Sequence, residues 1–356
     1  MAQHFLLSKK YRDISEYELS RFTENDWFDY FRNIRFGGLD KSICPRCGAI
    51  DAHYFFKAQK RWRCKHCHRY FSIKSGTVWA DSKLPLSKIA FIVEKFCSAA
   101  NGISALRVSA NANVQYKTAW VALHKLRESI IRTNQLSKLK GEVHVDGGHF
   151  GGKPRSGQFR HKAKPEEIAA KIKLGKSQGA RRSRGTRANY ERKKKNRRIV
   201  MVAREVVPGV GGTKTAVFLS STENDKAAKY IADNFIEPGS LVRTDENSAY
   251  SSYSARFTHE TVEHSKEYST IDGVNNNQAE SYFSRLRRCE YGVTHQMQAR
   301  YMWDYANEMA WREDSRWKTA KEKFDDLLFR TLSTGLTRWW RGYWQGYRRR
   351  DEMLIA

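Results

Sequence analysis

The stretch GEVHVDGGHFGG, residues 141–152, alternates apolar and polar side chains and ends in glycines. Alternation of this kind predicts a β-strand, and its period of two places Asp146 on the face opposite Val143 and Val145. The two glycines that follow the acid leave room for a bulky ligand to approach it. We therefore expect a strand that presents a carboxylate at a functional site.

The segments downstream of this stretch predict a domain of mixed strands and helices. Pro208-Gly209 indicates a turn between two of the strands, and the chain becomes helical from Asn277. The expected elements are strands at 197–206, 213–221 and 239–245 and a helix at 224–235. Strands and helices in this mixture are typical of an α/β domain.

Upstream, two Cys-x-x-Cys pairs are separated by 16 residues: Cys44 with Cys47, and Cys64 with Cys67. Four thiolates satisfy the tetrahedral preference of Zn²⁺, and the segment YFFKAQKRWR between the pairs can form a hairpin that brings them together. We predict one structural zinc ion per chain, in a zinc ribbon at residues 41–76. A shell closed by four sulfurs leaves no position for a substrate, so this site is expected to be structural.

Helical patterns lie on both sides of the cysteines. Residues 15–35 have one apolar stripe, within a predicted N-terminal helical segment at 1–40. Residues 84–134 contain three helical stretches, broken at Asn101-Gly102 and near 111–113, as in a helix-turn-helix unit. The last of these helices carries side chains that we predict to be exposed and suited to DNA: Gln115, Lys117, His124, Lys125 and Arg127. The alternative is an ordinary three-helix connector.

The charge balance predicts a polyanionic partner. Lys and Arg number 65 against 38 Asp and Glu, which gives a net charge of +27. Residues 153–198 alone hold 18 Lys/Arg and 3 Asp/Glu, and we interpret them as a mobile basic arm, with a solvated linker as the alternative. Nucleic acid is the commonest partner of such a chain. The candidate DNA contacts in the arm are Arg181, Arg182, Lys193, Lys194 and Lys195.

The C-terminal residues, 313–356, are expected to form a tail rich in arginine and aromatic residues. In RWWRGYWQGYRRR, residues 338–350, arginine alternates with Trp and Tyr. These side chains suit a clamp on nucleic acid by stacking and phosphate contact. They suit equally well a segment that docks its aromatic side chains on the body of the protein.

Composition also excludes several classes of protein. The longest aliphatic or aromatic run is about five residues, too short to span a bilayer, and the N-terminus lacks the apolar stretch of a signal peptide. Six cysteines in 356 residues are too few for a secreted disulfide scaffold. We expect a cytoplasmic, nucleoid-associated protein that binds double-stranded DNA and takes no small-molecule substrate.

Two further carboxylates lie where predicted elements begin or end. Asp245 closes the strand-like SLVRTD, and Glu280 lies at the start of the helix that begins near Asn277. Together with Asp146, they form a set from three separate elements that can hold two divalent cations for phosphodiester cleavage. Glu280 has an alternative role, in a capping box with Asn277.

In combination, these motifs resemble the insertion-sequence transposases of the DDE superfamily that carry an N-terminal zinc ribbon, the ISXO2-like group related to the Merlin elements. The resemblance covers roughly residues 15–312. Its three acidic motifs are matched by Val145–Gly152, by Thr244–Tyr250 and by Asn277–Phe283, with 34 residues between Asp245 and Glu280.

The resemblance implies an RNase H-like catalytic domain at 140–312, a mixed sheet flanked by helices. Asp146, Asp245 and Glu280 would be its catalytic acids and would hold two Mg²⁺ or Mn²⁺ ions. Arg287, seven residues after the last acid, would contact a phosphate.

The implied activity is binding of the terminal inverted repeats of an element, followed by DNA cleavage and strand transfer, by a homo-oligomer assembled on DNA. Two alternatives stay open. One is a DNA-binding regulator with an inactive transposase core, and the other is an RNase H-like nuclease or resolvase that performs no strand transfer.

Overall fold

The computed structural model describes residues 5–134, 137–151, 197–262, 276–295, 297–349 and 351–355. Most of the predicted basic arm lies outside these residues; only Arg197 and Arg198 are included, at the start of a strand. The candidate DNA contacts Arg181, Arg182, Lys193, Lys194 and Lys195 also lie outside the described residues.

The N-terminal segment forms two helices, α1 (Glu16–Ser20) and α2 (Glu24–Phe36). Each begins with a capping box, formed by Ser15 with Glu18 and by Thr23 with Asp26. The prediction of a single helix at 15–35 is wrong because the apolar spacing continues across the break. The extended backbone at Thr23, fixed by its capping bonds, starts a new helix there.

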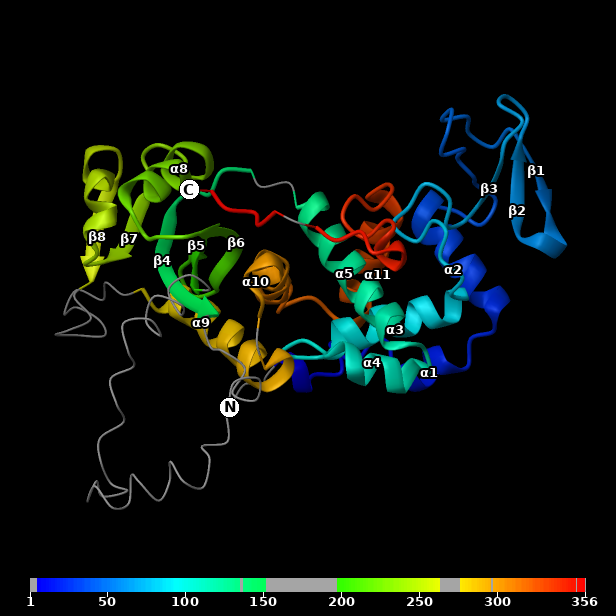
Figure 1. Ribbon diagram of the computed structural model, residues 1–356, viewed down its shortest axis with the longest axis horizontal. Helices are drawn as coiled ribbons and strands as arrows, with labels where there is room; N and C mark the ends of the chain where they lie inside the picture. The colour runs from blue at the N-terminus through cyan, green and yellow to red at the C-terminus, as the bar shows by residue number, and fades with distance from the viewer. Residues whose placement is uncertain are drawn as a thin grey trace, which may run out of the picture.

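A small antiparallel sheet follows, made of β1 (His53–Phe56), β2 (Arg61–Cys64) and β3 (Tyr70–Ser72). Helix α2 packs against it, with the ring of Phe28 stacked on the buried Trp62 at a centroid distance of 5.6 Å. Figure 1 shows this sheet at the end of the molecule away from the larger sheet.

The central part is a body of helices: α3 (Leu86–Ser98), α4 (Ala105–Ala112), α5 (Tyr116–Thr133) and α11 (Ala320–Ser333). The first three are separated at the predicted breaks. Helix α11 packs on α2, α3 and α5 and places Phe324, Leu327 and Leu328 in the same apolar core as the small sheet. Residues 313–356 therefore differ from the predicted tail, because α11 has an apolar face that this core buries.

Three of the side chains predicted to be exposed and suited to DNA are in fact buried. Lys125 and Arg127 are only 9% and 2% exposed, and the neighbouring His124 is fully buried. Helix α5 lies between α11 on one side and α10 (Ala299–Asp314) on the other, so these cations lie inside the protein. The prediction of exposure is wrong because it assumed that polar residues on a helix mark its solvent face.

The larger sheet has the strand order β6-β5-β4-β7-β8. Strands β6, β5 and β4 run antiparallel, and β4, β7 and β8 run parallel. The strands are β4 (Glu142–Gly151), β5 (Arg197–Val207), β6 (Gly211–Ser220), β7 (Leu241–Asp245) and β8 (Thr258–Val262). This mixed five-stranded order is that of an RNase H-like core, as expected, although β8 was not predicted.

Helices cover both faces of the larger sheet. Helix α8 (Asp225–Phe235) and the 3₁₀ segment Ser248–Ala255 share an apolar core with Val143 and Val145. Helices α9 (Asn277–Cys289) and α10 pack on the opposite face, against Phe150. Short 3₁₀ turns lie at Phe5–Leu7, Lys57–Gln59 and Tyr343–Gln345, and a π-helical turn, Glu290–Thr294, extends α9.

The C-terminal segment returns from the helical body to the sheet (Figure 1, red). Arg349 forms an ion pair with the buried Asp304 of α10, with 2.7 Å between nitrogen and oxygen. The amide of Ile355 donates to the carbonyl of Leu219 in β6 at 2.9 Å. The segment is thus docked on the body, the second of the two roles considered for it, while Trp344 and Tyr347 stay exposed.

A buried ion cluster joins the helical body to the sheet domain. Glu308 of α10 accepts hydrogen bonds from Arg127 of α5 at 2.7 Å and from Arg312 at 2.8 Å, and all three side chains are buried. Arg312 also donates to the carbonyls of Phe96 and Ala99 at the end of α3. Burial raises the pKa of Glu308, but the two guanidinium groups outweigh it, so that the pKa lies below its ordinary value.

Replacing Glu308 by Gln should therefore destabilise the protein by about 3–5 kcal/mol, because two buried guanidinium groups lose their counter-charge. Urea unfolding near neutral pH measures this loss. Because the folded-state pKa is lowered, Glu308 contributes stability above its ordinary pKa that is lost as the pH falls. The Glu308→Gln variant should therefore not show this loss of stability as the pH falls. Glu237→Gln, at an exposed position, is the matched control and should unfold like the parent.

Candidate functional site

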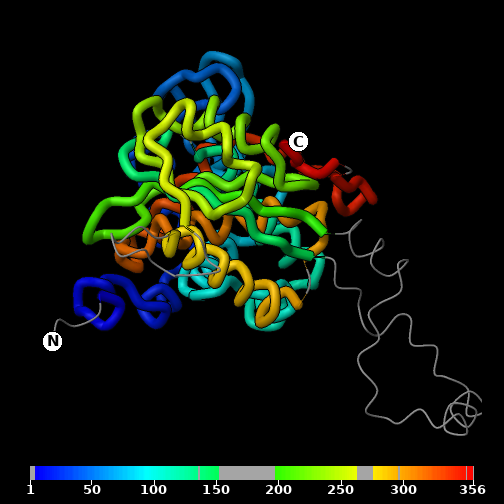
Figure 2. Tube along the Cα trace, turned by 90° about the vertical axis from the view of Figure 1, so that its left-hand side faces the viewer, coloured from blue at the N-terminus to red at the C-terminus, as the bar shows by residue number. Residues whose placement is uncertain are grey.

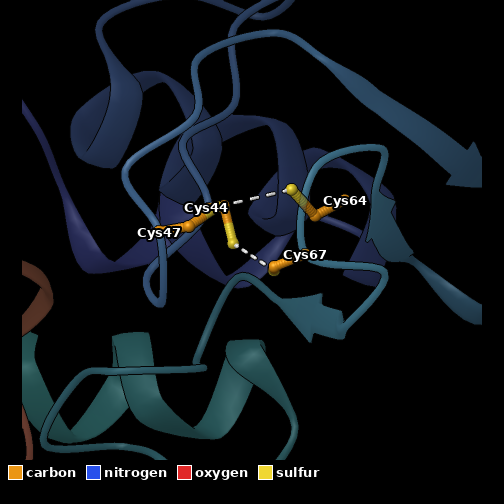
Figure 3. Close-up of side chains that lie close together, drawn as sticks. All are labelled: Cys44, Cys47, Cys64 and Cys67. Carbon is orange, nitrogen blue, oxygen red and sulfur yellow. Dashed lines mark hydrogen bonds between the residues drawn. The ribbon is translucent and has the colours of Figure 1, made fainter.

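Four cysteine side chains meet where the turn that holds Cys44 and Cys47, before β1, faces the turn that holds Cys64 and Cys67, between β2 and β3 (Figure 3). The Sγ atoms of Cys44 and Cys67 lie 3.6 Å apart, as do those of Cys47 and Cys64. Tetrahedral Zn²⁺ with metal–sulfur bonds of about 2.3 Å needs sulfurs about 3.8 Å apart, so the observed spacing fits this ion. The cysteines therefore support a bound zinc ion.

Backbone amides favour a thiolate at Cys64, whereas the neighbouring thiols raise the pKa of Cys47 to about 11 against the opposing effect of the amide of Ala49. Amide groups of Cys67 and His66 point at the sulfur of Cys64 and lower its pKa to about 6. In the first turn Gly48 adopts a left-handed conformation with φ of 74°, and its amide donates to the carbonyl of Cys44. A thiolate is the form that binds zinc, so the local fold prepares the ligand.

A second group forms where β7 ends beside the middle of its parallel neighbour β4. In the pairing of β4 with β7, His144 lies opposite Arg243. Two residues further along each strand come Asp146 and Asp245, and the continued register brings their carboxylates together. Their oxygens lie within 4.8 Å of each other and of one further acid, Glu223.

Glu223 was missed by the sequence analysis. It lies in the loop between β6 and α8, and the hydroxyl of the buried Tyr250 donates to its carboxylate at 2.7 Å. The sequence contains 38 acidic residues, and the loop that carries Glu223 has no motif that would distinguish this one from the others. In the structure its carboxylate approaches Gly147 closely: a Cβ atom there would lie 2.4 Å from a carboxylate oxygen of Glu223, so a larger residue would displace that carboxylate.

The two glycines after Asp146 serve the protein's own side chains. Glu223 fills the space beside Gly147, and the ring of Phe283 from α9 packs on Gly148, where a Cβ atom would lie 2.7 Å from it. The prediction that these glycines leave room for a ligand is therefore wrong. Their absence of side chains allows a loop and a helix to approach the strand closely.

Asp146 is the centre of the acidic group. Burial raises its pKa to about 7, and the charges of Asp245, Glu223 and Glu280 add to this, although the amide of Gly147 opposes it. Burial likewise raises the pKa of Glu223, with a further contribution from Asp245. Like charges held together out of water favour a bound cation, and the oxygen donors present are those that Mg²⁺ or Mn²⁺ prefers.

Glu280 lies in the first turn of α9, outside the group of three. Its charge raises the pKa of Asp146 but is not among the causes that shift the pKa of Glu223. The helix begins after Asn276, which makes no side-chain capping bond, so Asn277 lies inside the helix. The alternative role of Glu280, in a capping box with Asn277, is therefore not present.

The remaining predicted residues lie on the surface. Arg287 of α9 is exposed, with its guanidinium carbon 5.8 Å from the ring centroids of both Phe150 and Phe283. Gln115 and Lys117, at the start of α5, are exposed, as expected for residues that contact DNA.

Two domain families match parts of this chain. Residues 138–314 match the ISXO2-like transposase domain, and residues 22–70 match the transposase zinc-ribbon domain. The two matches together cover more than half of the sequence. The chain belongs to the ISXO2-like transposases. No individual curated protein matches it.

The matched regions contain both side-chain groups of this transposase. The zinc-ribbon match holds all four cysteines and also α2, which packs on the small sheet through Phe28. The domain match holds Asp146, Glu223, Asp245 and Glu280. Among its described residues, the transposase has no helix with the length and apolarity needed to cross a bilayer.

We expect one zinc ion per chain of this transposase, lost when Cys44 and Cys64 are both replaced by Ser. Elemental analysis of purified protein measures it. Cys97→Ser is the control and should retain zinc, because Cys97 lies apart from the cluster. Since Cys44 and Cys64 belong to the core shared with α3 and α5, the double variant should also melt at a lower temperature. Full zinc content in the double variant would refute this site.

The acidic group should make stability depend on pH and Mg²⁺. The pKa of Asp146 is raised from 3.8 to about 7, so its stabilising contribution is complete below the lower value and is lost as the pH rises to the higher one. Added Mg²⁺ should therefore raise the melting temperature more above pH 7 than well below it. Asp146→Asn should abolish this difference, whereas Asp233→Asn, at an exposed acid of α8, should preserve it.

Proposed function

We propose that this transposase binds the terminal inverted repeats of an insertion sequence and catalyses DNA strand cleavage and strand transfer with two divalent cations. The observation that carries the proposal is the meeting of Asp146, midway along β4, with Asp245, at the end of the parallel neighbour β7, with a third acid in reach. These acids would hold divalent cations, which when bound would supply activation of an attacking oxygen and stabilisation of the leaving oxygen of a phosphodiester.

The chain's own acids divide into two sets around Asp146. Asp245 and Glu223 lie with it in one group, and Glu280 acts on it from α9. We assign Asp146, Asp245 and Glu223 to one cation and Asp146 with Glu280 to the other. The hydroxyl of Tyr250 fixes the carboxylate of Glu223 from the side of the 3₁₀ segment.

The cationic and polar surface would hold the DNA. Arg287 is exposed two turns after Glu280 along α9 and is suited to bind a phosphate. Gln115 and Lys117 at the start of α5, together with the zinc ribbon, would contact the repeats. Assembly as a homo-oligomer on DNA and a cytoplasmic, nucleoid-associated location stay predictions.

The test is Mg²⁺-dependent cleavage of a duplex that carries the short inverted repeats flanking the gene. Asp146→Asn, Asp245→Asn, Glu223→Gln and Glu280→Gln should each lower the cleavage rate by at least about a hundredfold, because each removes one charge from a cation site while keeping the shape. Binding of the repeats, measured by gel shift, should stay unchanged. Glu246→Gln is the control: this exposed acid is one residue past Asp245 and outside the group.

Other outcomes favour the alternatives. Repeat binding without cleavage by the parent protein would favour a regulator with an inactive core. Cleavage without any product joined to target DNA would favour a nuclease or resolvase. Near-normal cleavage by Glu280→Gln, together with its loss in Glu223→Gln, would limit the ligands to the three clustered acids.

A further inference from the structure

A cleft with a volume of about 1240 Å³ lies on the helical body, away from the acidic group. Its walls come from residues 77–84, which connect the zinc ribbon to α3, from the first turns of α5, and from residues 336–347 after α11. The sheet strands contribute none of its described lining residues. Gln115, which begins the helix proposed to contact DNA, lies at this cleft.

Aromatic side chains dominate two of the walls. Trp79 and Trp340 are buried and form a rigid base, whereas Trp344 and Tyr347 are 50% and 71% exposed. Trp340 is held in place by its contact with His124, at a ring-centroid distance of 4.3 Å. The exposed rings are therefore carried on an anchored segment, and flat exposed aromatic rings are surfaces on which nucleic-acid bases stack.

A nearly buried ammonium group lies in the same cleft. Lys125 is 9% exposed and its Nζ lies 5.7 Å from the ring centroid of Trp79. Among the described residues this Nζ atom forms no hydrogen bond and no ion pair, although the backbone carbonyl of Lys125 accepts one from Ser129. Burial lowers its pKa to about 8, although the charges of Glu128 and Asp81 oppose this. An ammonium carries three donors, and burying it without acceptors is costly, so an anionic oxygen entering the cleft would be bound there.

Cations also line the outer part of the cleft. Lys83 and Arg341 are exposed lining residues, against one acid among the described lining residues, Asp81. The combination of cations with exposed aromatic rings fits a nucleic-acid strand whose bases are free to stack. In a duplex the bases already stack on one another, so the rings would find no partner.

We propose that this cleft binds a short unpaired segment of DNA, with bases stacked on Trp344 and Tyr347 and a phosphate at Lys125. The inference rests on the proposed function, because processing of the DNA ends would open the duplex and supply the unpaired strand. The cleft gives Lys125 a DNA contact from inside the protein, in place of the exposed contact expected from the sequence.

The test is binding of a short oligothymidine that contains one 2-aminopurine, whose fluorescence falls when the base stacks. The full chain with zinc is used without Mg²⁺, so that no DNA is cut. The double variant Trp344→Ala/Tyr347→Ala should bind this probe at least about tenfold more weakly and lose the quenching. Its binding of the inverted-repeat duplex should change by less than about twofold, since Trp344 and Tyr347 are not among the residues proposed to contact the duplex.

Trp317→Ala/Tyr17→Ala is the matched control, because these side chains are 56% and 74% exposed and lie outside the cleft. It should bind the probe like the parent. Lys125→Met should also weaken binding of the probe and reduce its salt dependence, without lowering the melting temperature, because a buried charge without acceptors is removed. If Lys125→Met does not fold, the aromatic double variant decides the question alone.

Unchanged binding and quenching in the aromatic double variant would overturn the proposal, and so would an equal loss of the probe and of the duplex. Binding of an acidic peptide in competition with the probe would show that the cleft takes anions without regard to bases, which also contradicts it. Asp146→Asn separates this test from that of the proposed function, because it should abolish cleavage and bind the probe normally.

Discussion

The arrangement of the helical body and the sheet domain depends on the buried ion pairs that Glu308 forms with Arg127 and Arg312. Helix α10 packs on β5 and β6 with one face and on α5 with another, so it is shared by the sheet domain and the helical body. Apolar contacts alone allow such helices to slide, whereas one carboxylate between Arg127 and Arg312 fixes the register. This ionic contact, together with the packing of Val121 of α5 in the core beneath the sheet, helps to set the position of α5 relative to the acids.

The electrostatic surroundings of the acidic group differ from those of Glu308. Glu308 has its counter-charges built into the fold, while Asp146, Glu223 and Asp245 have been brought together without any basic partner among the causes that shift the pKa values of Asp146 and Glu223. In a chain with a net charge of +27, cationic side chains were plentiful. The electrostatic surroundings of Asp146 and Glu223 therefore favour a metal cation.

The sequence was informative where function depends on neighbours along the chain. The cysteine spacing, the strand at 141–152 and the position of Asp245 all follow from local patterns, and the parallel pairing of β4 and β7 then brings the two acids together. Glu223 could not be found in this way, because its role arises from Tyr250 and from the glycine at 147. Arg127 was misjudged for the same reason, since its partner Glu308 is 181 residues away.

The C-terminal segment links the helical body to the sheet domain. Trp340 packs on His124 in the helical body, and Ile355 pairs with Leu219 in β6, so one short stretch of chain contacts both cores. Between these anchors lie the exposed rings of Trp344 and Tyr347. Because the segment is fixed at both ends, it cannot act as a free clamp that closes on DNA. A strand bound at these rings, as proposed, would therefore lie at a position set by the fold relative to both cores.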